Sequence, residues 1–333
     1  MSWDGVIAMS VEAGRPAIVE LGPRPPRTSD WVAAHRESIA TAVTDHGAVL
    51  IRGLDVRTAD DIAAVVRHLG RRPMAESDPF TARTRYAPGV YSGSAWPSDQ
   101  VMCMHHENSY GQEFPGLLVF CCATAPTRGG ATVLVDAAKV LDDLPGGLGQ
   151  DLVDRFDLVG WQLLRTYNGV VGVGWAEAFG LDDPADVERH CRDNDIEFHW
   201  DAEGGLRTRR RRQAIVHHPS TGQRVWFNQI AFLNEWTMDP GIRDFLVREF
   251  GPDGLPFNTR FGDGDQVDKT TVDVINEIYA AHTVREQWRT GDLLLVDNIR
   301  TAHGREPYEG TREILVGMAD PVQLSECGPP AAR

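Results

Sequence analysis

The chain is poor in the residues that build disulfide or zinc frameworks. Its 333 residues include five cysteines, an odd number, and no two of them are spaced as Cys-x-x-Cys. This excludes a disulfide scaffold and a cysteine-rich zinc module, and it suits a reducing compartment. Cys121 and Cys122 are adjacent, so on a strand they face opposite ways and are expected to be small core residues. We therefore expect a cytoplasmic protein.

Long apolar runs and positive charge are also scarce. No stretch approaches the roughly 20 apolar residues of a membrane span, and the start, Met-Ser-Trp-Asp-Gly, is unlike a signal peptide. The 33 Lys and Arg residues oppose 48 Asp and Glu, so the net charge is −15. Generic nucleic-acid binding needs the opposite field and is excluded. A hydrophobic content of 42% supplies the core of an ordinary globular protein.

One basic run departs from this acidic composition. The segment Arg207–Arg212 reads Arg-Thr-Arg-Arg-Arg-Arg. The simplest interpretation is a solvated loop or the end of a strand. The alternative is a docking patch for a phosphate or for an acidic partner.

The most informative segment contains Met104-His105-His106-Glu107-Asn108. It resembles a strand, and residues i and i+2 of a strand point to the same face, so His105 and Glu107 project together while His106 points away. A distant His303, brought alongside by the fold, completes a set of two histidines and one carboxylate. Such a set occupies one face of a six-coordinate metal and leaves the opposite positions open, as a non-haem iron(II) oxygenase requires.

Two other interpretations of this segment compete with an iron site. A His-x-Glu triplet also occurs by chance on surfaces and strand ends. Zinc accepts the same ligand types, but the metalloprotease pattern His-Glu-x-x-His is absent, since His106-Glu107 is followed by Asn, Ser and Tyr. The sequence around the three candidate ligands decides between these interpretations.

The pattern of elements predicts a mostly β fold with helical insertions. We expect two sheets packed as a jelly roll with flanking helices, in a single domain over residues 1–333 whose core spans about 28–320. Helices are predicted at Thr28–Asp45 (ended by Gly47), from Thr58 to Leu69, and at Asp136–Leu144, Ala185–Asp193, Pro240–Phe250 and Val267–Ala281. Strands are predicted at Ala48–Ile51, Val101–Glu107, Leu117–Cys122, Thr132–Val135, Ile196–Trp200, Ala214–His218, Arg224–Asn228, Leu293–Asp297 and Ile314–Met318.

A second cluster combines aromatic and amide side chains. It is a candidate substrate-facing surface, and a core strand is the alternative interpretation. Its members are Trp226, Phe227, Asn228, Gln229 and Asn234.

Three motifs, in this order, resemble the taurine dioxygenase / clavaminate synthase superfamily of iron(II)- and 2-oxoglutarate-dependent oxygenases. The similarity covers about residues 28–320 and is closest to the syringomycin-biosynthesis-like branch. It implies the double-stranded β-helix fold, a jelly-roll variant, and Fe(II), 2-oxoglutarate and O2 as cofactor and co-substrates. The motifs are Tyr-Ser-Gly-Ser-Ala-Trp-Pro at 91–97 leading into residues 104–110, Gly-Gly-Ala-Thr-Val-Leu-Val-Asp at 129–136, and Gly-Asp-Leu-Leu-Leu-Val-Asp-Asn at 291–298 with Ala-His-Gly-Arg at 302–305 and Arg312.

The resemblance implies roles for individual residues. His105, Glu107 and His303 match the iron ligands. Arg312 matches the position that binds the far carboxylate of 2-oxoglutarate, a role for which a permanently charged, bidentate guanidinium is suited, and Thr132 matches the hydroxyl donor to that carboxylate. Relatives often have two consecutive arginines where this chain has Arg312-Glu313, so Arg305 is a second candidate anchor.

The glycine pair before Thr132 is interpreted as a tight turn between strands. Glu107 also narrows the range of possible reactions. The related halogenases lack this carboxylate, and chloride takes its coordination position. The presence of Glu107 favours oxygen insertion or desaturation.

The resulting hypothesis is an oxygenase that hydroxylates an unactivated carbon of an amino acid or an amino-acid-derived substrate in natural-product biosynthesis. Desaturation by the same centre is the alternative within this class. The branch resemblance keeps a carrier-protein-tethered substrate in view, with Arg207–Arg212 as the docking patch for the acidic carrier. From another class, a non-catalytic, cupin-like metal-binding barrel needs no 2-oxoglutarate anchor, so Arg312 and Thr132 argue against it.

Overall fold

The computed structural model describes residues 3, 5–12, 15–76, 80, 83–170 and 172–329. The chain forms two compact units. The first unit comprises residues 1–107, 113–136 and 283–323, and the second comprises 108–112, 137–282 and 324–333. None of the helices in this described part of the chain is long and apolar enough to cross a membrane.

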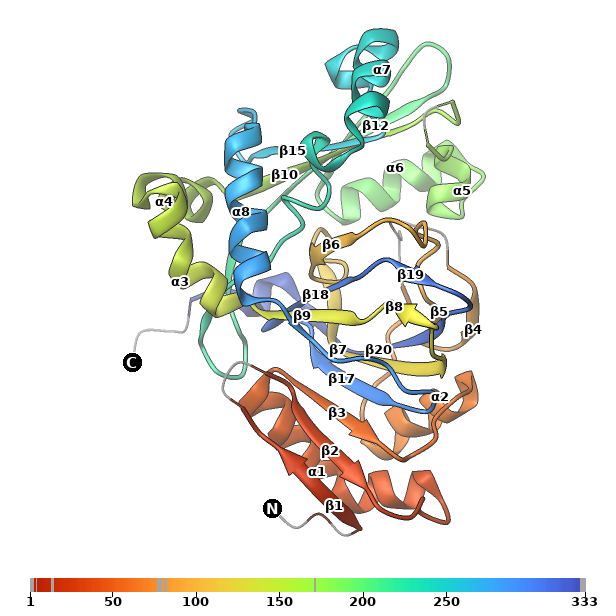
Figure 1. Ribbon diagram of the computed structural model, residues 1–333. Helices are drawn as coiled ribbons and strands as arrows, with labels where there is room; N and C mark the ends of the chain where they lie inside the picture. The colour runs from red at the N-terminus through yellow and green to blue at the C-terminus, as the bar shows by residue number, and fades with distance from the viewer. Residues whose placement is uncertain are drawn as a thin grey trace. The chain divides into compact units, whose positions relative to one another are not determined.

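An eight-stranded sheet is the larger layer of the first unit (Figure 1). Strands β2 and β3 run parallel, and the other neighbouring pairs run antiparallel. In spatial order the strands are β1 (Val6–Ser10), β2 (Ala17–Leu21), β3 (Ala48–Arg52), β17 (Leu293–Asp297), β7 (Glu113–Thr124), β20 (Glu313–Gln323), β5 (Val90–Ser92) and β4 (Arg85–Ala87).

Two helices cover one face of this sheet: α1 (Thr28–His46) and α2 (Ala59–His68). The first ends at Gly47, whose φ of 74° is the left-handed conformation that glycine adopts without strain. The second begins with a capping box, in which the Thr58 hydroxyl accepts from the backbone of Asp61 while the Asp61 carboxylate accepts from the backbone of Thr58. Both predicted helices, with these two end signals, are confirmed.

Strand β7 shows how the sheet separates two cores. Val119 and Cys121 pack into the core shared with α1 and α2. Leu118, Phe120 and Cys122 face the opposite way and belong to a second core. Both cysteines are free and fully buried, as expected for small core residues on alternate faces of a strand.

A four-stranded sheet contributes to this second core. Leu134 of β9 packs there with the inward residues of the larger sheet, so the two sheets of the first unit face each other. In spatial order its strands are β16 (Val284–Arg285), β9 (Thr132–Asp136), β18 (Thr301–Arg305) and β6 (Met102–His105), and a short pair, β8 (Arg128–Gly129) and β19 (Tyr308–Glu309), lies outside both sheets.

The second unit combines another four-stranded sheet with helices, and α8 runs beside α3 (Figure 1). The sheet order is β11 (Ile196–Trp200), β12 (Leu206–Arg212), β10 (Trp161–Tyr167) and β15 (Phe257–Phe261), and β13 (Ile215–His217) pairs with β14 (Arg224–Trp226). The helices are α3 (Ala137–Leu148), α4 (Gln150–Val159), α5 (Trp175–Phe179), α6 (Pro184–Asp193), α7 (Pro240–Phe250) and α8 (Lys269–His282), with 3-10 turns η1 (Glu235–Thr237), η2 (Pro252–Gly254) and η3 (Leu324–Cys327).

Several predicted boundaries were wrong. Strand β6 ends at His105, two residues before the predicted end, and β20 continues to Gln323, five residues beyond Met318. Strand β10 was not predicted at all. Six of its seven residues are buried, so it lacks the alternation of apolar and polar residues that marks a half-exposed strand.

The arginine run is a strand rather than a solvated loop, so that interpretation was wrong. It forms β12 between β10 and β11, and its residues alternate between buried and exposed. Arg210 and Arg212 are each 3% exposed. The Arg212 guanidinium donates to the backbone carbonyls of Tyr110 and Asn194. Composition suggested solvation because arginine is usually exposed, but its long stem packs well when the head group finds acceptors.

Candidate metal centre

Three side chains predicted as metal ligands lie together in the first unit. His105 and His303 are directly paired residues on β6 and β18, with ring centroids 4.3 Å apart. One ligand atom from each histidine and one from Glu107 all lie within 4.8 Å of one another. All three residues are at most 6% exposed. The fold thus brings together residues almost 200 positions apart in the chain.

Glu107 reaches this cluster by a different route from the one predicted. It lies beyond the end of β6, in a turn where the next residue, Asn108, has a φ of 55°. The Asn298 side chain holds the turn, since its Oδ1 accepts from the Glu107 backbone N–H (2.8 Å) and its Nδ2 donates to the Glu107 carbonyl (3.0 Å). Alternation along a strand therefore does not explain how Glu107 reaches the cluster, and that part of the prediction was wrong. The three side chains nevertheless come together.

His106 points away from the cluster, as predicted. Its side chain is fully buried, and its Nδ1 lies 2.6 Å from the Asn298 carbonyl oxygen. The neighbouring His105 instead uses Nδ1 to contact the Cys103 carbonyl oxygen at 2.8 Å. That contact leaves its Nε2 as the ring nitrogen with a lone pair for a metal.

The electrostatics of the cluster suit a divalent metal. Burial lowers the pKa of His105, and burial together with His105 lowers the pKa of His303 well below its ordinary value. Both rings are therefore neutral at physiological pH. Burial raises the pKa of Glu107, but the charge of the Arg83 guanidinium and its hydrogen bond outweigh burial, so that the pKa ends below its usual range and the group is a carboxylate. Two neutral imidazoles and a carboxylate are the donors that iron(II) accepts as a facial set.

A buried polar atom points to the same fit. The Nδ1 atom of His303 is buried and makes no hydrogen bond within the described part of the chain. Its Nε2 lies 3.9 Å from Oε2 of Glu107, too far for a hydrogen bond between them. A cation between Nε2 and this oxygen would engage both of those donors, whose burial without a partner is costly. The residues present therefore fit a metal ion.

The cluster opens into a cavity lined by both apolar and polar side chains. Phe120, Ile314 and Val316 supply an apolar wall, and the Phe120 ring meets the His303 ring edge-on at 5.3 Å. Such a wall excludes water from the reacting centre. The polar lining consists of Arg83, Ser94, His105, Glu107, Thr132, His303, Arg305 and Arg312.

Arg312 and Thr132 are neighbours at one side of this cavity. Arg312 precedes β20, its Nε donates to the Gly130 carbonyl (2.9 Å), and its Nη2 lies 3.4 Å from Thr132 Oγ1. Gly129 and Gly130 have φ of 65° and 69°, but Gly129 ends β8 and only Gly130 and Ala131 connect it to β9, so the predicted tight turn is instead a short connection. A Cβ on Gly130 would lie 3.1 Å from Arg312 Cδ, so glycine lets the arginine approach this connection.

Arg305, the other candidate anchor, is committed elsewhere. Its guanidinium donates to the carbonyls of Trp96 (3.0 Å), Gln100 (2.9 Å) and Pro97. These bonds fix the segment before β6 rather than leave the head group available. Arg305 is paired with Thr132 across β18 and β9, but the guanidinium that lies beside the Thr132 hydroxyl is that of Arg312.

Comparisons with known proteins agree with this geometry. The model of the taurine catabolism dioxygenase TauD, TfdA family matches residues 18–319. The chain belongs to this family. It is an iron(II)- and 2-oxoglutarate-dependent dioxygenase, with O2 as the other co-substrate. Membership of this family excludes the zinc interpretation and the interpretation as a non-catalytic barrel.

Relatives and solved structures extend the similarity over nearly the whole chain. The dapdiamide synthesis protein DdaC of Enterobacter agglomerans is 31% identical over 87% of this chain and 88% of its own length. A clavaminate synthase-like protein of Arabidopsis thaliana is 26% identical over 88% and 87%. Two solved structures share the fold: a putative alpha-ketoglutarate-dependent taurine dioxygenase from Burkholderia xenovorans (TM-score 0.52, 14% identity, covering 96% of this chain and 94% of that one) and the PvcB protein from Pseudomonas aeruginosa (TM-score 0.54, 13% identity, covering 96% and 92%).

Three residues that surround the metal-ligand cluster were not predicted to belong to the site. Asn298 was noted only as part of a motif. Arg83 donates from Nη2 to Glu107 Oε2 at 2.9 Å, and its Nη1 lies 3.7 Å from Oε1 of Glu76. Burial, and then the charge of Glu107, raise the pKa of Glu76 to about 7 despite Arg83. No sequence pattern marks residues 76 and 83, because neither lies in a helix or strand.

The aromatic and amide cluster of the second unit is better explained as core. Asn234 is fully buried, and its Nδ2 donates to Thr259 Oγ1 at 2.7 Å. Asn228 is 1% exposed, donates to the Ala214 carbonyl and accepts from the Ile230 backbone N–H. These amides therefore satisfy backbone and side-chain groups of the protein itself.

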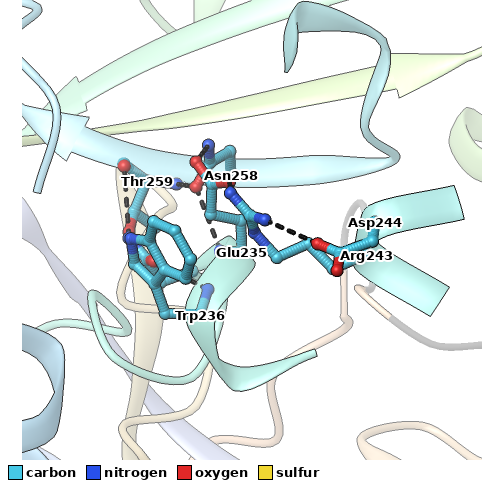
Figure 2. Close-up of polar contacts among 7 residues, drawn as sticks. Glu235, Trp236, Arg243, Asp244, Asn258 and Thr259 are labelled. Atoms are coloured by element: carbon cyan, nitrogen blue, oxygen red, sulfur yellow. Dashed lines mark hydrogen bonds and ion pairs between the residues drawn. The ribbon is translucent and has the colours of Figure 1, made fainter. Parts of the chain in front are cut away.

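A partly buried ion pair continues this network (Figure 2). Glu235 accepts from Asn258 Nδ2 at 2.9 Å and from Arg243 Nε and Nη2 at 2.9 and 2.6 Å. The Arg243 guanidinium also stacks 3.8 Å above the Trp236 ring. The pair joins α7 and η1 to β15, which is a structural role.

Proposed function

We propose that this dioxygenase hydroxylates an unactivated carbon of an amino acid or an amino-acid-derived substrate in natural-product biosynthesis. The observation that carries the proposal is the complete set of two histidines and one carboxylate at the cavity, which keeps Glu107 where a halide would otherwise bind. The relative named for dapdiamide synthesis supports the biosynthetic setting. Desaturation by the same centre differs only in the fate of the substrate after hydrogen abstraction.

In this proposal His105, Glu107 and His303 hold the iron. When bound, iron(II) and 2-oxoglutarate supply the oxidising power that breaks the C–H bond. The chain contributes two neutral imidazoles and one carboxylate on one side of the site, which leaves the opposite positions to the co-substrates. Phe120, Ile314 and Val316 form an apolar wall that would limit the access of water to the reacting centre.

Arg312 and Thr132 bind the far carboxylate of 2-oxoglutarate. Burial, and then repulsion from Arg305, lower the pKa of Arg312 to about 10, so the guanidinium stays charged at neutral pH. The Thr132 hydroxyl already accepts from Trp288 Nε1 at 3.2 Å and lies beside Arg312 Nη2. Its own hydrogen is then available to a third group, and a carboxylate oxygen is the natural acceptor.

The architecture is part of the proposal. The two facing sheets of the first unit are taken as the two halves of a double-stranded β-helix, with His105 and His303 on its smaller sheet. The second unit, inserted largely between β9 and β16, is taken as part of the same catalytic domain.

The function is tested by co-substrate turnover across substrates. Purified enzyme with iron(II), 2-oxoglutarate and O2 is offered free amino acids and their carrier-protein thioesters, and succinate and hydroxylated product are quantified together. We expect one substrate class to give both in equal amounts. Succinate without an oxygenated product, or a product with a new double bond, would replace hydroxylation by uncoupled turnover or by desaturation.

We further propose that the exposed side of β12 binds an acidic partner such as a substrate-bearing carrier protein. Arg207, Arg209 and Arg211 project from the opposite face to the buried arginines. A groove includes Arg207, Arg209 and Arg260 in its lining, together with Glu197 and Asp253, which pair with Arg209 and Arg260. Arg209 pairs with Glu197 at 3.5 Å, whereas the Arg207 guanidinium has no ion pair or side-chain hydrogen bond within the described part of the chain, so its charge is available on an otherwise acidic protein.

Removing this charge should affect only a tethered substrate. For the variant R207Q/R209Q we expect unchanged kcat/KM on a free amino acid and a fall of roughly tenfold on the carrier-bound form, because electrostatic steering sets the association rate. Added salt should reproduce the fall in the unmodified enzyme. The matched control is R189Q/R248Q, which removes two exposed charges elsewhere in the second unit. Equal salt dependence on both substrates would leave β12 a purely structural strand.

A further inference from the structure

A chain of three buried ionisable side chains leads away from the candidate metal site. Glu76, Arg83 and Glu107 have side chains that are 4%, 9% and 8% exposed. Arg83 lies between the two carboxylates, 3.7 Å from Glu76 and 2.9 Å from Glu107. A buried guanidinium is tolerated only when it is paired, so both carboxylates help to hold it in place.

The far end of this chain is anchored to the larger sheet. The backbone N–H of Glu76 donates to the Tyr91 hydroxyl at 2.7 Å, and Tyr91 belongs to β5. Two residues earlier, the Met74 backbone N–H donates to the Met318 carbonyl on β20. Glu76 therefore starts from a backbone that the sheet holds in place, and it limits where the Arg83 head group can lie.

The near end acts on the oxygen that faces the histidines. Oε2 of Glu107 accepts from Arg83 and is also the oxygen that lies 3.9 Å from His303 Nε2. The backbone of Glu107 sits in a turn outside β6 and is held by Asn298, but Asn298 does not touch the carboxylate in any of these bonds. Among the described residues, Arg83 is the hydrogen-bond donor to that carboxylate.

We propose that Arg83 is a positioning residue that orients the Glu107 carboxylate for iron, and that Glu76 fixes Arg83 in turn. This inference rests on the proposed role of Glu107 as an iron ligand. Groups that hydrogen-bond to a metal ligand set its direction, and their loss lowers metal affinity even though they never touch the metal. The strand register fixes His105 and His303, whereas Glu107, being in a turn, needs this side-chain support.

The test uses Co(II) as a spectroscopic substitute for iron in the absence of O2. For R83Q we expect Co(II) affinity to fall by about 10- to 100-fold and the visible ligand-field spectrum to change. R83K should recover part of the Co(II) affinity and part of the wild-type spectrum. Lysine keeps the positive charge, but it lacks the forked guanidinium that lies between the two carboxylates. E76Q should change the Co(II) affinity and the spectrum in the same direction as R83Q, but by a smaller amount. If Glu76 acts through Arg83, the double variant R83Q/E76Q should have the same Co(II) affinity as R83Q alone.

The matched control is R85Q, which removes an exposed arginine two residues along the chain and should bind Co(II) like the unmodified protein. Wild-type affinity and spectrum in R83Q would overturn the inference, as would tighter binding, which would mean that Arg83 acts by repelling the cation. A rise in substrate KM alone would make Arg83 a substrate-binding residue instead. E107A, measured in parallel, separates the two hypotheses: if it retains Co(II) affinity, the proposed ligand set has failed rather than the role of Arg83.

Discussion

Replacing His105, Glu107 or His303 by alanine is expected to abolish turnover in each case. In the proposed ligand set these three side chains, which form the one such cluster among the described residues, hold the metal, so each substitution would remove a third of the protein ligands. Iron(II) affinity should fall by more than the roughly 10- to 100-fold that a change outside the ligand set costs. The measurement is anaerobic titration with iron(II), followed by succinate formation on addition of 2-oxoglutarate and O2.

The control for this set is His106, the neighbour that faces away. Because His106 is fully buried and bonded to the Asn298 carbonyl, H106A should lower the free energy of unfolding by about 1–3 kcal/mol. The folded fraction should still bind iron(II) normally. If H106A loses the metal while H105A keeps it, the assignment of the two adjacent histidines is reversed.

The parts of this site that were predictable are those carried by local pattern. The strand that carries His105 was predicted from local pattern, and the family resemblance linked it to Glu107 and His303, although Glu107 lies in a turn beyond the strand. The support for Glu107 was not predictable in the same way. Asn298, Arg83 and Glu76 act through a turn and through residues outside regular structure, and periodicity carries no information about such positions.

The errors in the predicted fold have the same cause, because local pattern does not show contacts between distant segments. Helix α2 was predicted because Thr58 and Asp61 form a capping box within four residues. Strand β12 was misjudged because Arg210 and Arg212 look like surface residues until their acceptors are known, and these acceptors come from distant segments of the chain. Tertiary hydrogen bonding decided the outcome where local polarity indicated the opposite.

The Arg312→Ala variant is expected to need far more 2-oxoglutarate. A charge-assisted pair between a guanidinium and a carboxylate contributes on the order of 2–4 kcal/mol, which corresponds to roughly 30- to 1000-fold in affinity. Iron(II) binding should change little, because Arg312 contacts Gly130 and Thr132 rather than the metal cluster. Since the pKa of Arg312 is about 10, the 2-oxoglutarate requirement of the unmodified enzyme should show no contribution from this group between pH 6 and 8.

Two further variants show whether the anchor is correctly placed. T132V removes one hydrogen bond and should raise the requirement by only about fivefold, equivalent to roughly 1 kcal/mol. R305Q should leave the requirement unchanged while it lowers stability, because Arg305 holds the carbonyls of Trp96 and Gln100. The readout is the 2-oxoglutarate dependence of the charge-transfer band that a chelated keto acid gives with iron(II) without O2. A large shift in R305Q with none in R312A would move the anchor to Arg305, and a shift in neither would mean that a residue outside this pair binds the carboxylate.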